Sequence, residues 1–399
     1  MKGTSMLQSD DRILTSHVGS LPRPTDLLAM LEAAETGGDI DQATVETRIT
    51  QAIEDIVSQQ RSAGVDIVND GENSKTSYTL FVQDRLNGVG PVPPEKERPK
   101  TAQHADLMEH QDLVEIMAQK TVGLSWFDRM APPAATGPVS YGNRAPLERD
   151  IANLQAACTK ADAREAFINS VSPGVMTKFV PNMHYASEDA YVEALTEALR
   201  PEFEAIVEAG FILQIDAPDL GSARHNQYQD LDEAGFLKIA ERNVEALNHA
   251  TRNIAPDRMR MHICWGNYEG PHTHDIPFSS LHPVVMKARP AGLLIEGANP
   301  AHAHEFEDLK TLGLPDGKVL LPGVIDTTTN FVENPRLVAQ RICNWADAVG
   351  RERVIASTDC GFATFAGPNN PVAPTVVWSK LRALSDGAAL ASDQLWGKR

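Results

Sequence analysis

Two side chains that can bind a transition metal stand two positions apart in the stretch Met261–Gly266, which reads MHICWG. If residues 258–265 form a strand, the alternation of faces places His262 and Cys264 on the same side. An imidazole and a thiol on one face of a strand can share a metal ion. This spacing therefore predicts part of a metal site.

Two later stretches offer the ligands that this pair lacks. Residues 293–296 form an apolar run that ends in a carboxylate, and residues 354–361 contain an apolar run followed by a thiol. The resulting candidate ligands are His262, Cys264, Glu296 and Cys360. One nitrogen, two sulfurs and one oxygen suit tetrahedral zinc, which lowers the pKa of a bound thiol and so generates a nucleophilic thiolate. The alternative is that the cysteines are small core residues.

The elements that must position these ligands are short apolar strands that alternate with amphipathic helices. All four candidate ligands fall at or near the C-terminal ends of expected strands. Such alternation favours a parallel sheet, and eight units favour a (β/α)8 TIM barrel, which carries its site at that end of the strands. We expect the eight strands within residues 13–24 and 65–72 and at 174–180, 211–218, 260–265, 293–296, 319–325 and 354–357.

An excursion from the barrel is expected after the second strand. From about residue 86 to 135 the pattern is irregular and interrupted by prolines. Thr136–Tyr141 and Gly174–Val180 both read as strands, which is one strand too many, and we place Gly174–Val180 in the barrel. The chain is then a single TIM-barrel domain over residues 1–399, with approximately residues 86–170 as an insertion that forms a lid or an interface.

The composition is that of an ordinary globular protein, with 42% hydrophobic and 23% charged residues in a chain of 399. The net charge of −18 argues against nucleic-acid binding, which requires a basic face. No stretch is long and apolar enough to span a membrane, and residues 1–12 lack the apolar core of a signal peptide. Because the four cysteines are irregularly spaced, we expect a reduced, cytoplasmic protein; a homo-oligomer is left open.

The motifs together resemble a known family. The metal-ligand motifs resemble the zinc site in the C-terminal catalytic barrel of cobalamin-independent methionine synthase, and further segments resemble that family in the same order. These further segments are Val18–Ser20, Asp70–Glu72, Gln214–Pro218 and Gly323–Asp326. The resemblance runs from Thr15 to Gly361 and lacks the second, N-terminal barrel of the synthase. The single-barrel branch of that family also includes epoxyalkane:coenzyme M transferases.

The resemblance implies roles for individual residues of these motifs. The four candidate ligands would hold zinc, while Ser20, Glu72 and Asp216 would position an amino-acid thiol such as homocysteine. The two carboxylates would then face its ammonium group, which needs anionic partners. The alternative is that Glu72 and Asp216 cap helices or support the ligands, and that Ser20 caps a loop.

One departure from the family concerns its proton donor. The synthase has a histidine two residues beyond the aspartate that corresponds to Asp326, and this chain has Thr328 there. A threonine is not a general acid at neutral pH. His17 and His184 lie at expected strand ends, and we take them as catalytic candidates that replace this histidine.

These features imply a zinc-dependent thiol alkyltransferase. We rank first methyl transfer to homocysteine or a related thiol through a zinc-bound thiolate, as in methionine biosynthesis, with a small-molecule thiol and an alkyl donor such as a folate as partners. The second hypothesis is thiolate attack on an epoxide, as in the coenzyme M transferases, for which Arg23, Arg144 and Arg224 could bind the sulfonate. The third is a zinc-stapled binding protein without catalysis.

Overall fold

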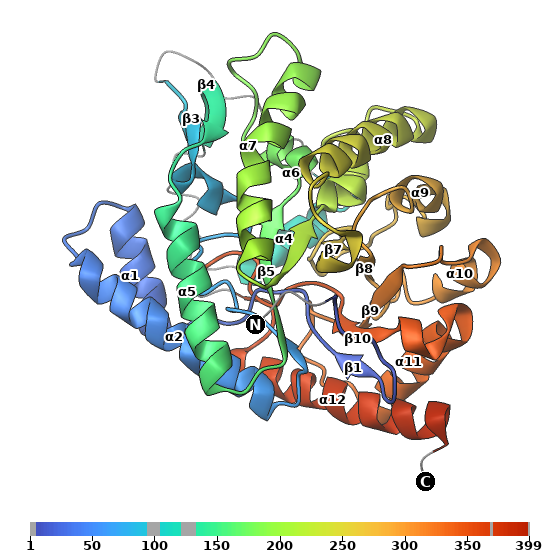
Figure 1. Cartoon of the computed structure of the whole chain (residues 1–399). Coiled ribbons are helices and arrows are strands. Elements are labelled where there is room, and N and C mark those ends of the chain that lie inside the picture. Colours follow the sequence, from blue (N-terminus) through green and yellow to red (C-terminus); the bar gives the residue numbers. More distant parts are fainter. Residues whose placement is uncertain (1–4, 94–103, 121–132, 368–369, 398–399) are drawn as a thin grey trace.

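The computed structural model describes residues 5–93, 104–120, 133–367 and 370–397. Eight parallel strands form one sheet in the order β1-β10-β9-β8-β7-β6-β5-β2. Its two end strands approach each other where the Asp66 amide donates to the Thr15 carbonyl oxygen, at 3.2 Å. The sheet is therefore nearly closed, and the predicted TIM-barrel fold is confirmed (Figure 1).

The barrel strands are short, and most are fully buried. They are β1 (Leu14–Thr15), β2 (Ile67–Val68), β5 (Glu165–Val171), β6 (Ile212–Asp216), β7 (Met259–His262), β8 (Gly292–Ile295), β9 (Val319–Ile325) and β10 (Ile355–Thr358). The main helices are α1 (Thr25–Glu35), α2 (Gln42–Ser62), α5 (Ala145–Lys160), α6 (Pro173–Phe179), α7 (Glu188–Glu208), α8 (Glu233–Ala250), α9 (Phe278–Val285), α10 (Phe306–Leu312), α11 (Pro335–Val349) and α12 (Pro374–Trp396).

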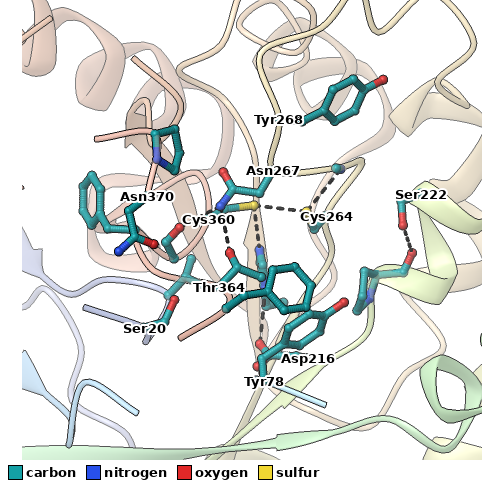
Figure 2. Close-up of a pocket in the computed structure, with 18 of the residues that line it drawn as sticks. Ser20, Tyr78, Asp216, Ser222, Cys264, Asn267, Tyr268, Cys360, Thr364 and Asn370 are labelled. Carbon is teal, nitrogen blue, oxygen red and sulfur yellow. Dashed lines mark hydrogen bonds and ion pairs between the residues drawn. The ribbon is translucent and has the colours of Figure 1, made fainter. Parts of the chain in front are cut away.

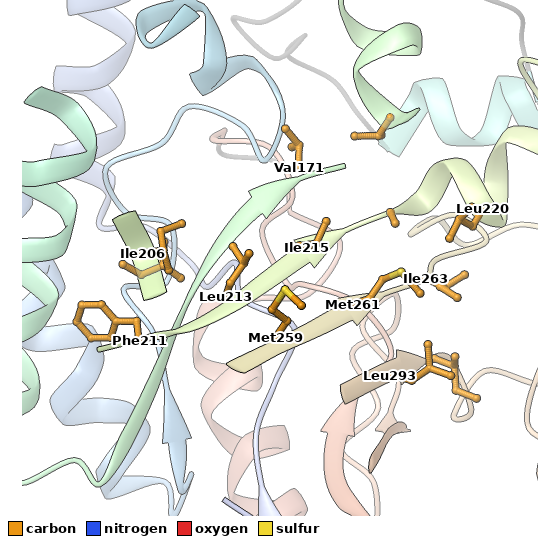
Figure 3. Close-up of a cluster of buried hydrophobic side chains, with 14 of the residues drawn as sticks. Val171, Ile206, Phe211, Leu213, Ile215, Leu220, Met259, Met261, Ile263 and Leu293 are labelled. Carbon is orange, nitrogen blue, oxygen red and sulfur yellow. The ribbon is translucent and has the colours of Figure 1, made fainter. Parts of the chain in front are cut away.

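Alternation along each strand divides the core into two parts. On β6, Leu213 and Ile215 pack outward against helices, as Figure 3 shows beside Met259 and Met261 of β7. Residues of the opposite parity, such as Ile212, form a separate cluster with apolar residues of the other strands. Because successive side chains point to opposite faces, this second cluster fills the barrel interior.

Arg260 occupies the place of an apolar residue inside the barrel. Its guanidinium lies 3.5 Å from the centre of the Phe167 ring and is fully buried. It donates hydrogen bonds to Gln214 Oε1 (2.7 Å), Ser16 Oγ (2.8 Å) and the carbonyl oxygen of His17 (3.0 Å). These bonds connect β7 to β6 and to the segment after β1, directly below the C-terminal ends of the strands.

The position expected for the third barrel strand is wrong. That strand is β5, Glu165–Val171, and Gly174–Val180 lies mostly within helix α6. The helix begins here because Ser172 accepts a hydrogen bond from the Val175 amide and Pro173 occupies the first turn. Polar Asn169 and Ser170 interrupt the apolar run of β5 and disguise it in the sequence.

The expected excursion after β2 is present but shorter than predicted. It contains an antiparallel hairpin of β3 (Leu86–Pro91) and β4 (Pro133–Tyr141), with α3 (Ala105–Glu109) and α4 (Gln111–Lys120) between them. The hairpin stands apart from the barrel strands in Figure 1. Helix α5 packs on α2 and leads into β5, so residues 145–171 belong to the barrel. The remaining residues of the expected excursion, 94–103 and 121–132, lie outside the described residues.

A buried ion-pair network anchors the base of this excursion. Arg85 lies 2.7 Å from Asp150 of α5 and 3.0 Å from Glu202 of α7, and all three side chains are almost completely buried.

Within the described residues, no helix has both the length and the apolar character to cross a bilayer.

We expect Arg85→Met to lower the free energy of unfolding by about 3–5 kcal/mol, because it leaves buried Glu202 without its cation and Asp150 with only Arg149, at 3.3 Å. The matched control is Arg144→Met, which removes an exposed pair with Glu148 at 3.8 Å and should cost less than about 0.5 kcal/mol. Urea unfolding of both variants, followed by circular dichroism, measures the difference. Equal unfolding midpoints for the two variants would contradict the anchoring role.

Candidate metal centre and substrate pocket

The four predicted metal ligands converge at the C-terminal ends of three strands. His262 ends β7, Cys264 follows two residues later, and Cys360 follows two residues after β10. The Sγ atoms of Cys264 and Cys360 are 3.0 Å apart, and Cys360 Sγ lies 3.8 Å from His262 Nε2. Glu296, directly after β8, brings Oε1 to 3.9 Å from Cys360 Sγ. The two cysteines face each other in Figure 2.

Two aspartates hold the ligand-bearing segments in place. Asp216, at the end of β6, lies 3.3 Å from His262 Nδ1, while His262 Nε2 lies 3.3 Å from the carbonyl oxygen of Asp359 and 3.8 Å from Cys360 Sγ. Asp359 accepts hydrogen bonds from the backbone amides of residues 297, 298 and 299 at 2.8–2.9 Å. A carboxylate behind the distal nitrogen of an imidazole is the usual support of a metal-binding histidine.

The donor set fits a metal ion. Both cysteines are reduced and buried, and a separation of 3.0 Å is well beyond a disulfide bond of about 2.05 Å. The hydrogen bond shared with Cys264, together with burial and the nearby Glu296 carboxylate, raises the pKa of Cys360 well above its ordinary value. His262, Cys264 and Cys360 each bring one ligand atom within 4.8 Å of the others, and the Glu296 carboxylate lies beside Cys360. A divalent cation would neutralise this buried group.

A cavity of about 670 Å³ opens onto these ligands. Its wall contains His262, Cys264 and Cys360 together with all three predicted substrate-binding residues. Those three residues are Ser20, Glu72 and Asp216. The structure therefore brings the thiol-binding and ammonium-binding groups of the prediction into one cavity.

Glu72 is a buried carboxylate with a free acceptor. It has a left-handed backbone, with φ of 56°, and its Oε2 atom has no hydrogen-bond partner among the described residues. Burial, opposed by Lys75 and assisted by the charge of Asp216, raises the pKa of Glu72 to about 7. An unpaired carboxylate of this kind is matched by a cationic ligand group.

Ser20 and Asp216 have partners that leave part of their bonding capacity available. Ser20 Oγ accepts a hydrogen bond from the Ala363 amide at 3.3 Å, so its own proton remains free to be donated. Asp216 accepts from Asn169 and Gln214, each at 3.0 Å, while also supporting His262. Asp216 thus lines the cavity and also supports His262, one of the predicted metal ligands.

The sequence analysis missed several residues that line the cavity. They include Tyr78, His104, Lys178, Tyr268 and Phe365. Lys178 lies on α6, the element mistaken for a strand, and burial lowers its pKa to about 8. His104 precedes α3 in the excursion, where irregular sequence gave no signal of a site. Tyr268 directly follows the metal-ligand strand, and that proximity was the one signal available.

The two predicted catalytic histidines do not reach the cavity. His17 is buried below it, with Nε2 at 2.8 Å from Gln60 Oε1, and burial lowers its pKa to about 4. His184 is exposed and packs against Tyr185. Neither histidine lines the cavity. The direction of a side chain at a strand end depends on its position in the strand and on the path of the following loop. Thr328 donates its hydroxyl proton to Asp326 and does not line the cavity either.

The arginines considered for a sulfonate are also absent from the cavity wall. Arg23 donates to the backbone oxygens of Ala363 and Glu72, and Arg224 donates to that of Gln229. Arg144 forms an exposed pair with Glu148. None of these three arginines contributes to the lining of the cavity.

Comparisons with known proteins agree with this architecture. The family "Cobalamin-independent synthase, Catalytic domain" matches residues 13–92. A methionine synthase of Saccharolobus solfataricus is 23% identical over 96% of this chain and 95% of its own. A 2-hydroxypropyl-CoM lyase of Xanthobacter autotrophicus is also 23% identical, over 97% and 96% of the two chains.

A solved structure confirms the fold. The B12-independent methionine synthase from Shewanella sp. W3-18-1, in complex with selenomethionine, superposes with a TM-score of 0.71 at 21% identity. The match covers 97% of this chain and 99% of that one. The resemblance predicted from the sequence is thus confirmed: this chain is similar to the cobalamin-independent methionine synthase catalytic domain, and methionine synthases and a CoM lyase are among the curated proteins that it resembles.

Proposed function

We propose that this protein is a zinc-dependent alkyltransferase that methylates homocysteine or a related amino-acid thiol. The observation that carries the proposal is a single cavity that contains both a His-Cys-Cys metal-ligand group and an unpaired, buried carboxylate, Glu72. The first feature suits a thiol and the second an ammonium group. An amino-acid thiol carries both groups on one small molecule.

His262, Cys264, Glu296 and Cys360 would hold the zinc ion. When bound, zinc would lower the pKa of the substrate thiol, so that the thiol reacts as a thiolate at neutral pH. Glu296 is the weakest candidate ligand, because its two oxygens already accept hydrogen bonds from the Trp265 amide (2.7 Å) and from Asn299 (2.5 Å).

Glu72 and Asp216 would orient the substrate by accepting hydrogen bonds from its ammonium group. Ser20 would donate its free hydroxyl proton to the carboxylate of the same substrate. These groups lie around the metal ligands in one cavity, so the sulfur is directed toward the site where it becomes a nucleophile. In the transfer, the sulfur forms a bond to the methyl carbon, and the bond to the donor breaks with its electron pair on the leaving group.

The rest of the cavity wall is largely apolar and suits the alkyl donor. Tyr78, Phe179, Phe362 and Phe365 line this cavity, and Leu107 of α3 adds to its apolar surface. Burial raises the pKa of Tyr78 well above its usual value, so this phenol stays neutral. A largely apolar wall excludes water from a thiolate and favours its reaction with carbon.

A second candidate function is thiolate attack on an epoxide, with coenzyme M as the thiol. It is favoured by the full-length similarity to a 2-hydroxypropyl-CoM lyase and by Thr328, which departs from the synthase pattern. Lys178 is a cation of the cavity wall that could meet a sulfonate. We rank this candidate second because the unpaired Glu72 carboxylate would face no cationic group on that thiol.

Zinc K-edge absorption of the purified protein tests which thiol binds. We expect one additional sulfur neighbour of zinc after homocysteine is added and no change with coenzyme M. The reverse result would favour the epoxide reaction, and Lys178→Met should then abolish the change. Zinc that responds to neither thiol would contradict both transferase functions.

A variant of one ligand separates catalysis from a purely structural metal. We expect Cys360→Ala to remain folded, to bind zinc at least tenfold more weakly and to lose thiol alkylation, because one of two thiolate ligands is gone. The control is Cys343→Ala, whose partly exposed thiol contacts Gln394 away from the cavity. Metal analysis and thermal unfolding measure the two properties. Global unfolding of Cys360→Ala alone would indicate the zinc-stapled binding protein.

The raised pKa of Glu72 predicts a pH dependence of ligand binding. Glu72 attracts an ammonium group only when ionised, so affinity should be full above pH 7 and fall as the pH decreases through 7. From pH 8 to pH 6 we expect the affinity for methionine, which has no thiol to titrate, to decrease roughly tenfold. Isothermal titration calorimetry provides the affinities.

Two variants test this assignment. Glu72→Gln should bind methionine weakly at both pH values. Glu165→Gln is the matched control, because burial also raises the pKa of Glu165 to about 7, yet its carboxylate accepts from the Leu7 amide and lies outside the cavity wall. Glu165→Gln should keep the wild-type pH dependence. If the pH dependence of methionine binding is lost in Glu165→Gln, the titrating group is not Glu72.

A further inference from the structure

A second group of potential metal ligands lies beyond Cys264, with His272 and Asp275 in the loop between β7 and α9 and His302 in the segment between β8 and α10. His272 Nδ1 and His302 Nε2 lie 2.8 Å and 2.9 Å from the same oxygen of Asp275, Oδ2. The three side chains are 3–8% exposed. One ligand atom from each of these residues falls within 4.8 Å of the others. Two imidazoles and a carboxylate thus converge on one point without any sulfur.

The second nitrogen of each ring also faces an acceptor. His272 Nε2 lies 3.2 Å from the carbonyl oxygen of Tyr268, and His302 Nδ1 lies 3.1 Å from Glu305 Oε1. A neutral imidazole has one proton, which its outer acceptor would take. The inner nitrogen would then direct a lone pair at the Asp275 carboxylate. This contact requires a positive charge between the two groups, either a proton or a metal ion.

A third imidazole distinguishes these two possibilities. His225 is 1% exposed, and neither of its ring nitrogens has a properly directed hydrogen bond among the described residues. Its Nδ1 nevertheless lies 2.7 Å from Asp275 Oδ1, the second oxygen of the same carboxylate. Protons on His272 and His302 would satisfy Asp275 Oδ2 but would still leave the His225 ring nitrogens without a well-directed hydrogen bond. A cation at Asp275 accounts for polar atoms gathered here without hydrogen bonds.

Both imidazole rings have the outer hydrogen-bond acceptors and the packing that metal-binding histidines require. The carbonyl oxygen behind His272 and the carboxylate behind His302 are the usual acceptors for the distal nitrogen of a ligating histidine. The ring centres of Trp265 and His302 are 4.4 Å apart, and those of Tyr268 and His272 are 4.6 Å apart. His272 has a left-handed backbone, with φ of 57°, a strained conformation that its surroundings must maintain.

We propose that His272, Asp275 and His302 bind a divalent first-row transition metal ion at a site separate from the cysteine-containing centre. Two nitrogens and one oxygen suit borderline ions such as Fe²⁺, Co²⁺ or Zn²⁺. The ion fixes the loop from Trp265 to Asp275, which contributes Asn267 and Tyr268 to the wall of the substrate cavity.

Metal analysis of the full-length protein, saturated with Co²⁺ and desalted, tests the proposal. We expect two ions per chain in the wild type and one in each of two variants, Cys264→Ser/Cys360→Ser and His302→Asn. The optical spectrum identifies which ion remains. Charge transfer from thiolate to cobalt should persist in His302→Asn and disappear in the double cysteine variant, which keeps only the weak ligand-field bands.

His282→Asn is the matched control, because this buried histidine contacts the carbonyl oxygen of Gly313 away from both groups and should leave two ions bound. If His302→Asn does not fold, as judged by circular dichroism, the folded double cysteine variant still decides. One bound ion in it supports the second site, and none overturns it in favour of protonated imidazoles. Loss of the cysteine-bound ion alone would count against the proposed function and not against this site.

Discussion

A buried negative charge must be compensated, and this requirement governs the C-terminal end of the barrel. Two thiols, Glu296, Asp216, Glu72 and Asp359 are gathered there with almost no access to water. Asp359 is satisfied by backbone amides and Asp216 by side-chain amides and an imidazole. Cys264 accepts one hydrogen bond, from the Gly266 amide at 3.2 Å, and Glu72 Oε2 has no partner among the described residues. In the proposed function, a metal ion and a substrate ammonium group supply the charges that complete the arrangement.

The barrel supplies this arrangement with the rigidity that it needs. Arg260 ties β7 to β6 and to the loop after β1 from below, while Asp359 ties the end of β10 to the loop after β8 from the side. Each metal ligand therefore sits on an element that is fixed by at least one hydrogen bond outside the ligand group. A cation bound there would meet donors that are already close together, so little conformational entropy remains to be lost.

The sequence predicted those parts of the molecule that depend on local pattern. Apolar strands that end in His262, Glu296 or Asp216 are legible because parallel barrel strands are short and buried. Strand β5 was missed because it carries two adjacent polar residues with different partners: Asn169 donates to Asp216 inside the barrel, and Ser170 donates to Glu202 of α7 on the outer face. This polarity hides the strand. His17 and His184 could not be judged, because the direction of a side chain after a strand depends on the loop's tertiary contacts.

The substrate cavity is built from two independent sources. The part that carries the metal-ligand group comes from the strand ends, and another part of the wall comes from His104, Leu107 and Met117 of the excursion between β2 and α5. That excursion is joined to the barrel at a fixed base through Arg85. Changes in its sequence or length can therefore reshape the space for the second substrate while the acceptor geometry stays the same. One barrel framework can in this way serve thiol alkylations that share an acceptor chemistry but differ in their electrophile.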